Sequence, residues 1–287
     1  MPEPRTVLIT GASSGIGQAC ARYLDGLGFT VWAAVRREED GEELVRLTST
    51  RLRVLMLDVT DPDSIAEAGR KVSEVEGKTG LWGLVNNAGI SVAGPLELLP
   101  LSAVRTQFEV NVIGALAVTQ TFLPLLRLRR GRLVNISSIA GLAATPFLGP
   151  YSSSKFALEA MSDALRLELA PWGISVSLVE PGAVQSQIWS RAAMAASRTL
   201  GEVAPQAFQL YEQPLSRMKD VIAKAVKRAI PAEVVARAVA HALTASRPQI
   251  RYLVGKDARL RAFMKWMLPA RVHDRLLAWF LGLPHGG

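Results

Sequence analysis

The sequence predicts a doubly wound α/β fold, in which one parallel sheet of seven strands carries helices on both faces. Short β-branched, apolar segments alternate with longer helical patterns along the 287 residues, and most of these segments end in small or polar residues. Such alternation gives right-handed crossovers and a parallel sheet. Because the sequence has no internal repeat or low-complexity linker, we expect a single domain followed by a C-terminal helical extension.

The first strand is expected at residues 6–9, and it runs directly into a glycine-rich turn and then a helix at about residues 18–27. Glycines let the backbone turn tightly and approach a pyrophosphate, whose charge is met by the N–H groups of the next helix. The strand before the turn and the amphipathic helix after it favour this interpretation over a turn without a ligand. The turn reads Thr10-Gly11-Ala12-Ser13-Ser14-Gly15-Ile16-Gly17.

The second strand, expected at residues 29–35, ends at Arg36 and Arg37. In dinucleotide-binding folds an acidic residue at this place binds the ribose hydroxyls, whereas an arginine suits a 2′-phosphate. Arg36 therefore favours NADP(H) as the cofactor. NAD(H) is the alternative, with Arg36 then an ordinary exposed arginine at the end of a strand.

The third strand, at residues 53–57, ends at Asp58 and Val59, and the fourth begins near residue 81 and enters a turn at 86–89. Asp58 either accepts a hydrogen bond from an adenine amine or caps the local backbone. Since the carboxyl ends of parallel strands form the edge where such sheets bind ligands, these segments should line one cleft. Later strands are expected at residues 131–136, 175–179 and 251–254.

A helical pattern at residues 102–126 contains Asn111 among apolar neighbours. A buried amide needs hydrogen-bond partners, and a kinked helix with a bound water is one way to supply them.

Tyr151 and Lys155 stand four residues apart and share one face of an expected helix, while Ser138 precedes the tyrosine by thirteen positions. A nearby ammonium favours the phenolate and lowers the tyrosine pKa from its usual value of about 10. Ser138 adds a neutral hydroxyl that can hold a substrate carbonyl or alcohol. Alone the pair is a weak signal, because a Tyr and a Lys at this spacing are usually packing and a solvated tip.

Together these motifs resemble the short-chain dehydrogenase/reductase family over about residues 5–255. Residues 57–60, 81–90 and 123–126 look most like its retinol and hydroxysteroid dehydrogenase branch. The resemblance implies a Rossmann-type sheet and an NADP-preferring oxidoreductase acting on CH-OH groups. The motifs are Thr10-Gly11-x-x-x-Gly15-x-Gly17, Asn86-Asn87-Ala88-Gly89, Asn111, Ser138, Tyr151-x-x-x-Lys155 and Pro181-Gly182.

The resemblance also implies a role for each matching residue. Tyr151 would be the catalytic acid/base, with Lys155 lowering its pKa and binding the nicotinamide ribose. Ser138, favoured over Ser137 by its interval, would position the substrate oxygen, and Asn111 would hold a water of the proton relay. The implied cofactor-binding residues are Gly11, Ser13, Ser14, Gly15, Ile16, Gly17, Arg36, Asp58, Val59, Asn87, Ala88, Gly89, Tyr151, Lys155, Pro181, Gly182, Val184 and Ser186, the last replacing the threonine usual in the family.

Two segments bear on the substrate. Residues 142–150 are nearly uncharged and predict an apolar wall beside Tyr151. Residues 183–230 are expected to form a lid, whose apolar side chains either face the substrate or pack as core. We expect a lipophilic secondary alcohol or ketone resembling a steroid, retinoid or fatty ketone; the alternatives are a small polar carbonyl or a non-catalytic nucleotide-binding regulatory protein. The lid residues concerned are Ile188, Trp189, Met194, Phe208, Tyr211 and Met218.

The chain has a formal net charge of +8, and half of this excess lies in residues 256–287. No nucleic-acid-binding motif accompanies the charge, so nucleic acid is not an expected partner. Pro269 divides this tail into two short helical pieces rich in basic and aromatic residues. The tail makes peripheral contact with an anionic membrane, or it packs over the substrate pocket or a partner subunit, which we favour. The expected boundary follows residue 255.

The single cysteine, Cys20, excludes an intrachain disulfide and a cysteine-rich metal site, and we expect it to be buried and inert. It also indicates a reducing compartment, and no charged-then-apolar leader precedes Val7. The sequence has no uninterrupted run of 18 apolar residues, so a membrane-spanning helix is not expected. We therefore expect a cytoplasmic protein without a metal. The resemblance further implies a homo-oligomer, a dimer or a tetramer, paired through the helices around Asn111 and Lys155.

Overall fold

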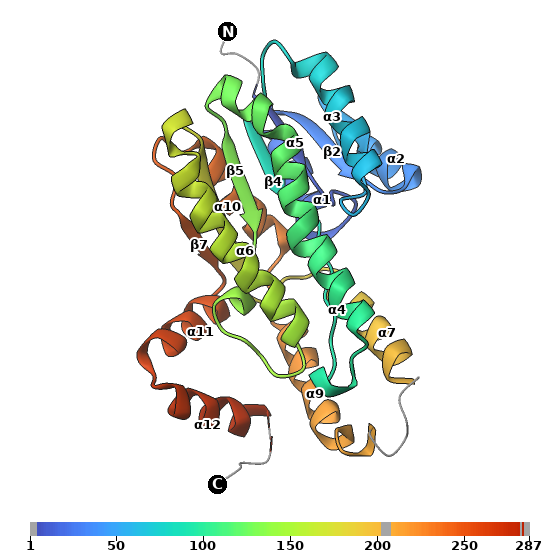
Figure 1. Ribbon diagram of the computed structural model, residues 1–287, viewed down its shortest axis with the longest axis vertical. Coiled ribbons are helices and arrows are strands. Elements are labelled where there is room, and N and C mark those ends of the chain that lie inside the picture. The colour runs from blue at the N-terminus through green and yellow to red at the C-terminus, as the bar shows by residue number, and fades with distance from the viewer. Residues whose placement is uncertain (1–4, 202–207, 282, 284–287) are drawn as a thin grey trace.

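The computed structural model describes residues 5–201, 208–281 and 283, with side chains left undescribed at 195, 198–201, 280 and 281. A parallel sheet of seven strands in the order β3-β2-β1-β4-β5-β6-β7 forms its centre, with helices on both faces (Figure 1). The predicted fold class is therefore confirmed. The order reverses direction between β1 and β4, which is where sheets of this kind bind ligands.

Every expected strand is present among the described residues, with bounds that differ by at most two residues. The difference is largest at the ends of β4 and β6. β6 continues through Glu180 and Pro181 because these residues pair with Leu253 and Val254 of β7. The strands are β1 (Thr6–Ile9), β2 (Thr30–Val35), β3 (Leu52–Met56), β4 (Gly83–Asn86), β5 (Arg132–Ile136), β6 (Ser175–Pro181) and β7 (Arg251–Val254).

One face of the sheet is covered by α1 (Gly15–Gly26), α2 (Glu38–Arg46) and α10 (Ala232–Thr244). Cys20 and Leu24 lie four residues apart on α1, and Val235 and Val239 repeat the spacing on α10, so each helix turns one apolar face inward. Cys20 is buried as expected, and burial raises the pKa of its thiol to about 12.

The other face is covered by α3 (Pro62–Glu76), α5 (Gly114–Arg129) and α6 (Gly149–Glu168). One turn of π-helix (Glu109–Ile113), which we call the π-turn, joins α4 (Leu101–Phe108) to α5. Residues 101–129 therefore form one helix with an irregular middle. By length and composition this helix is apolar enough to cross a membrane, although polar residues interrupt it and the sequence has no uninterrupted run of 18 apolar residues. Its apolar residues have a place in the fold, because Val118, Phe122 and Leu126 are fully buried beneath the sheet.

Beyond the carboxyl edge of the sheet lie the helices of the expected lid and tail (Figure 1). Leu148 and Met218 are buried there, and Trp189 and Leu277 pack against them in what we call the third apolar cluster. The helices are α7 (Ile188–Gly201), α9 (Glu212–Lys227), α11 (Lys256–Met267) and α12 (Ala270–Leu281), and the short turns elsewhere are η1 (Leu96–Leu98), η3 (Ile139–Gly141) and η4 (Ala170–Trp172). The tail thus forms two helices, which Pro269 separates as predicted.

Candidate active site

Tyr151, Ser138 and Lys155 meet at the carboxyl edge of the sheet. Tyr151 lies in the first turn of α6, and Ser138 follows β5, so the neighbouring elements bring the two hydroxyls into a hydrogen bond. The Lys155 ammonium lies 5.8 Å from the centre of the Tyr151 ring. All three residues line the same cleft, which also contains the glycine turn.

Burial has the largest effect on the pKa values of Tyr151 and Lys155. It raises the pKa of Tyr151, and the hydrogen bond with Ser138 opposes that rise. The lowering of this pKa by Lys155 stays a prediction. Burial also lowers the pKa of Lys155 to about 8, while Glu159 acts in the opposite direction. The Lys155 ammonium is fixed in place by donating to the Ile136 carbonyl at 2.7 Å.

Asn111 lies in the π-turn behind Tyr151 and does not line the cleft. Its side-chain oxygen accepts from the Ile90 N–H at 2.9 Å, and its amide donates to the Ile90 carbonyl and to Ser154. Ser154 donates in turn to the Tyr151 carbonyl. The helix has a π-turn at this position, a feature frequent at functional sites. These protein partners satisfy the amide, and its role in holding a water stays a prediction.

The glycine turn is built for close approach of a ligand. Gly11 and Gly15 have φ values of +63° and +56°, which favour glycine. Gly17 does not line the cleft but lies behind the turn, where an added Cβ would stand 2.2 Å from the Gly11 carbonyl. The first turn of α1 carries no acidic residue, so its N–H groups face the cleft without a competing negative charge.

Most of the predicted cofactor residues line the cleft. Its volume of about 380 Å³ lies within the range of small-molecule sites. With positive-φ glycines, a free helix N-terminus and three basic side chains, it fits a dinucleotide. The predicted cofactor residues that line it are Gly11, Ser13, Ser14, Gly15, Ile16, Arg36, Asp58, Val59, Asn87, Ala88, Gly89, Tyr151, Lys155, Pro181, Gly182, Val184 and Ser186.

Arg36 and Asp58 lie together at the far end of the cleft. Arg36 is exposed, whereas its neighbour Arg37 is occupied by an ion pair with Asp40 at 2.7 Å. Of the two roles predicted for Asp58, capping is observed, because one oxygen accepts from both the N–H and the hydroxyl of Thr60. Burial acts to raise the pKa of Asp58, but the Thr60 hydrogen bonds and the Arg36 charge together lower it.

The loop after β6 depends on a residue that the sequence analysis did not single out. The Asp257 carboxylate, in the first turn of α11, accepts from the Ala183 N–H at 2.8 Å. An added Cβ on Gly182 would lie 2.2 Å from both Asp257 oxygens, so this loop and α11 fit closely only with glycine there. The start of the tail therefore fixes a wall of the cleft. Its only sequence signal is an acid three residues beyond the last strand.

The apolar wall at residues 142–150 is also attached to α11. Arg261 donates to the Ala143 carbonyl at 3.0 Å and to the Thr145 hydroxyl at 2.7 Å. Burial lowers the pKa of this arginine, opposed by Asp257 one turn earlier. Arg261 is one of the basic residues of the tail, and its side chain holds the wall.

The predicted lid residues divide between the two expected uses. Ile188 and Trp189 line the cleft, whereas Met218 is buried in the third apolar cluster. Tyr211 donates its hydroxyl to Glu97 at 2.5 Å, and Met194 is exposed. Phe208 is partly exposed, and residues 202–207 of the lid lie outside the described residues.

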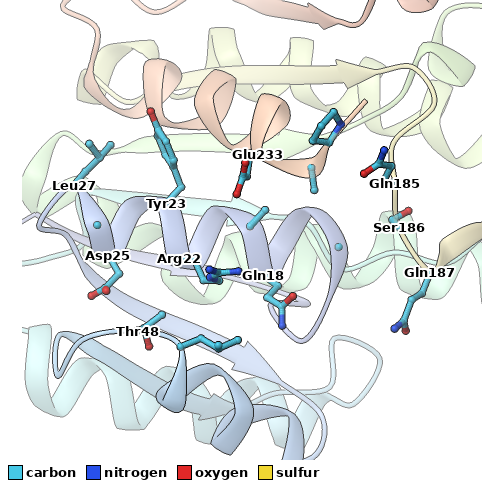
Figure 2. Close-up of a pocket in the computed structure, with 16 residues that line it drawn as sticks. Gln18, Arg22, Tyr23, Asp25, Leu27, Thr48, Gln185, Ser186, Gln187 and Glu233 are labelled. Atoms are coloured by element: carbon cyan, nitrogen blue, oxygen red, sulfur yellow. The ribbon is translucent and has the colours of Figure 1, made fainter. Parts of the chain in front are cut away.

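A second hollow of about 1090 Å³ runs along the outer side of α1 (Figure 2). Gln18 and Arg22 face it from α1, and Glu233 borders it from the start of α10. It shares Gly15, Ser186 and Gln187 with the cleft. Among the described residues, no group of three or more His, Cys, Asp or Glu side chains could hold a metal ion.

A doubly wound sheet with a serine, a tyrosine and a lysine converging beside a dinucleotide cleft defines a class of nucleotide-binding oxidoreductases. A profile of the short chain dehydrogenase family matches residues 5–196. The chain belongs to this family, and its relatives place it in the retinol and hydroxysteroid dehydrogenase branch that the motifs predicted.

Several proteins are similar to this chain over most of its length. Retinol dehydrogenase 5 of Mus musculus is 38% identical over 97% of this chain and 89% of its own. An 11-beta-hydroxysteroid dehydrogenase type 2 of Oryctolagus cuniculus is 37% identical over 98% of this chain and 71% of its own. An NADPH-dependent 3-dehydrocapnine reductase of Ornithobacterium rhinotracheale is 34% identical over 95% of each chain. A short-chain dehydrogenase crystal structure from Streptomyces avermitilis has a TM-score of 0.78 and 30% identity, over 97% of both chains.

Proposed function

We propose that this oxidoreductase interconverts a lipophilic secondary alcohol and the corresponding ketone, with NADP(H) as its preferred cofactor. One observation carries the proposal: the hydrogen-bonded Tyr151 and Ser138 hydroxyls stand beside Lys155 in a dinucleotide cleft. A phenol and an ammonium so placed can move a proton to or from a substrate oxygen. The cofactor, when bound, accepts or supplies the hydride.

In ketone reduction Tyr151 donates its proton to the substrate oxygen, and Ser138 holds that oxygen in place. Burial raises the pKa of Tyr151, which keeps the phenol protonated before the reaction. In alcohol oxidation the phenolate is needed, and the Lys155 ammonium stabilises it. This charge interaction is stronger in the buried site than it would be in water. The side chain of Asn111 supports the group from behind through Ser154 and the Tyr151 carbonyl.

The preference for NADP(H) rests on Arg36. This residue lines the cleft at the end of β2, where a 2′-phosphate would lie, and Arg37 is already paired with Asp40. The relative from Ornithobacterium rhinotracheale, which is named for its NADPH dependence, adds support. NAD(H) remains the alternative cofactor, and its use with equal kcat/KM would overturn the preference.

The substrate class rests on the apolar residues beyond Tyr151. Leu148 and Met218 are buried together, and Trp189 both borders the cleft and packs against them. A pocket with this lining gains about 25 cal/mol for each Å² of apolar substrate surface that it buries. The names of the retinol and hydroxysteroid dehydrogenase relatives point to the same class.

The decisive assay follows cofactor absorbance over a panel of steroids, retinoids, fatty ketones and small polar carbonyls. We expect turnover of a lipophilic compound and a loss of about 10³-fold or more in kcat in Tyr151→Phe, because the proton donor is removed. Preferential reduction of small polar carbonyls would overturn the substrate class. Tight cofactor binding without turnover of any compound would favour the second candidate function, a nucleotide-binding regulator.

We further propose that the tail, α11 and α12, turns its outer side to an anionic membrane from the cytoplasm. Trp266 and Trp279 are 81% and 74% exposed, and basic residues such as Lys265 lie on the same helices. The inner side contacts α9 and the third apolar cluster, in line with the expected packing over the pocket.

Co-sedimentation of the protein with anionic vesicles should fall in the double variant Trp266→Ser and Trp279→Ser. Unchanged partitioning would favour a partner subunit on this surface, and mass measurement in solution would then report a dimer or tetramer.

A further inference from the structure

Behind Lys155 lies a buried group of charged side chains that the proposed chemistry does not use. Glu159 stands one helical turn after Lys155 on α6, and Glu180 lies near the end of β6. Glu180 is 0% exposed and Glu159 is 6% exposed. Two carboxyl groups are therefore buried next to the residue that sets the charge of the active site.

One guanidinium faces these carboxyls. The Arg251 Nε lies 3.1 Å from a Glu159 oxygen and 3.2 Å from a Glu180 oxygen. Its Nη2 lies 2.7 Å from Asp163, which is 41% exposed and also pairs with Arg166 at 3.7 Å. The Arg251 charge is thus divided among three carboxyls. Arg166 contacts only the outermost of them, so Lys155 is the other cation beside the buried pair.

The closeness of Glu159 and Glu180 calls for a proton. One oxygen of each carboxyl group lies within 3.2 Å of the same Arg251 Nε, and neither Glu180 oxygen has a hydrogen-bond partner among the described residues. Two ionised carboxylates in contact would repel strongly in a buried site, so one of them carries the hydrogen. Glu159 also accepts a hydrogen bond from the Arg251 Nε at 3.1 Å, which stabilises its ionised form, so Glu180 is the member that stays protonated.

The titration of the neighbouring groups agrees with this assignment. Burial raises the pKa of Glu180 to about 8, and the charge of Glu159 adds to the rise. Burial raises the pKa of Glu159 too, but Ser137 and Arg251 oppose it. Since Glu159 raises the pKa of Lys155 against the effect of burial, the carboxylate and the ammonium support each other.

We propose that Glu180 is a neutral carboxylic acid that donates to the Glu159 carboxylate, and that Glu159 thereby keeps Lys155 in its ammonium form during turnover. Both glutamates are positioning residues, because they act on the substrate only through Lys155 and Tyr151. The inference rests on the roles proposed above for those two residues. It follows that ionisation of Glu180 at alkaline pH places a second negative charge near Lys155 and extends the range in which the ammonium persists.

The first test is the pH dependence of kcat/KM for ketone reduction. Glu159→Gln should move the alkaline limb down by about one pH unit, because Lys155 loses its counter-charge. Glu180→Gln keeps an N–H donor for Glu159, so we expect the wild-type profile below pH 8 and an earlier decline above it. The matched control is Asp163→Asn, which removes a carboxylate from the same arginine on the exposed side and should leave the profile in place. A Glu159→Gln profile that coincides with wild type would refute the proposal.

A second measurement is independent of turnover. The infrared C=O band of a protonated carboxyl should be present in the wild-type protein at pH 7, titrate away above pH 8, and be missing in Glu180→Gln. If no compound is turned over but the band is found, the inference about the proton stands and the proposed activity fails. If turnover is found without the band, the inference fails and the activity stands.

Stability provides a further check with a defined sign. The pKa of Glu180 is higher in the folded chain than its ordinary value of 4.5, so folding favours the protonated form. The wild-type protein should therefore lose stability as the pH rises from about 4.5 through about 8. Glu180→Gln, which cannot ionise, should lack this part of the loss, so its melting temperature should fall less than that of wild type between pH 6 and pH 9. Parallel curves for the two proteins would contradict a protonated Glu180.

Discussion

The two sides of the cleft are held together in different ways. On the cofactor side, the Thr10 hydroxyl accepts from the N–H groups of Asn87 and Ala88, and the Asn87 amide donates to the carbonyls of Thr10 and Gly11. On the substrate side, which also carries the predicted cofactor residues of the loop after β6, that loop is held by Asp257 and the apolar wall by Arg261. Neighbouring strands close the first side, whereas a helix from the far end of the chain closes the second.

This difference separates cofactor binding from substrate positioning. The glycine turn is fixed by strands β1 and β4, which pair in the centre of the sheet. The walls around the substrate depend on α11, which contacts β7 and η3 but pairs with no strand. We therefore group α11 with the active site, although the boundary expected from the sequence would leave it outside. Damage to the first side should remove cofactor binding, and damage to the second should reduce catalysis while the adenine half of the cofactor still binds.

The largest effect is expected from Gly17→Ala on the cofactor side. The new methyl group would lie 2.2 Å from the Gly11 carbonyl and 2.5 Å from the Asn87 amide nitrogen, so the turn must move. Overpacking of this kind costs about 1–3 kcal/mol, and the displaced turn should no longer bind NADP(H). Thermal unfolding with and without cofactor measures both effects. Gly26→Ala on the same helix is the control, since nothing lies within 4 Å of its added methyl group. Cofactor protection retained in Gly17→Ala would contradict this account.

A smaller and different loss is expected from Asp257→Ala on the substrate side. Loss of a charge-assisted hydrogen bond to the Ala183 N–H should release the loop and lower kcat about tenfold. The Kd of the adenine half of the cofactor, measured with 2′-phospho-ADP-ribose, should change little. Asp257→Asn keeps an acceptor oxygen and should recover most of the activity, and Asp274→Ala tests an exposed acid of the same tail. An equal loss of cofactor-half affinity in Asp257→Ala would break the proposed separation.

The smallest effect is expected from Arg36→Ser at the edge of the cofactor side. Removing this cation should raise the KM for NADPH about tenfold and leave the KM for NADH and for the ketone nearly unchanged. Arg37→Ser is the matched control, because Arg37 is paired with Asp40 rather than facing the cleft. Equal responses to NADPH in the two variants would show that Arg36 does not recognise the 2′-phosphate.

Much of the cofactor side could be predicted because its signals are local. A short apolar segment, a glycine turn and a helix follow one another at residues 6–26, and the parallel sheet places the ends of β1 and β4 together. The strand bounds agree to within two residues, and Tyr151 and Lys155 share a face of α6 as their spacing required. The roles of these residues in binding and catalysis stay predictions until the variants are measured.

The rest could not be predicted because it depends on residues distant in the chain. Asp257 follows Ala183 by 74 positions, and Arg261 follows Ala143 by 118. Neither has a motif, and on a basic, aromatic tail each has the appearance of a surface charge. The same holds for Glu180, whose partner Glu159 comes from a helix and whose shared arginine comes from another strand.

The sequence by itself determined the strand and helix order, the phosphate-binding turn and the residues able to move a proton, since each depends on patterns that are local in the sequence. The tertiary structure alone decided which charges are buried, which carboxyl keeps its proton and which part of the tail supports the active site. The physical reason is that burial and hydrogen bonding are properties of the packed chain. A carboxyl group that would be ionised on an exposed helix changes its protonation when the fold removes water from around it.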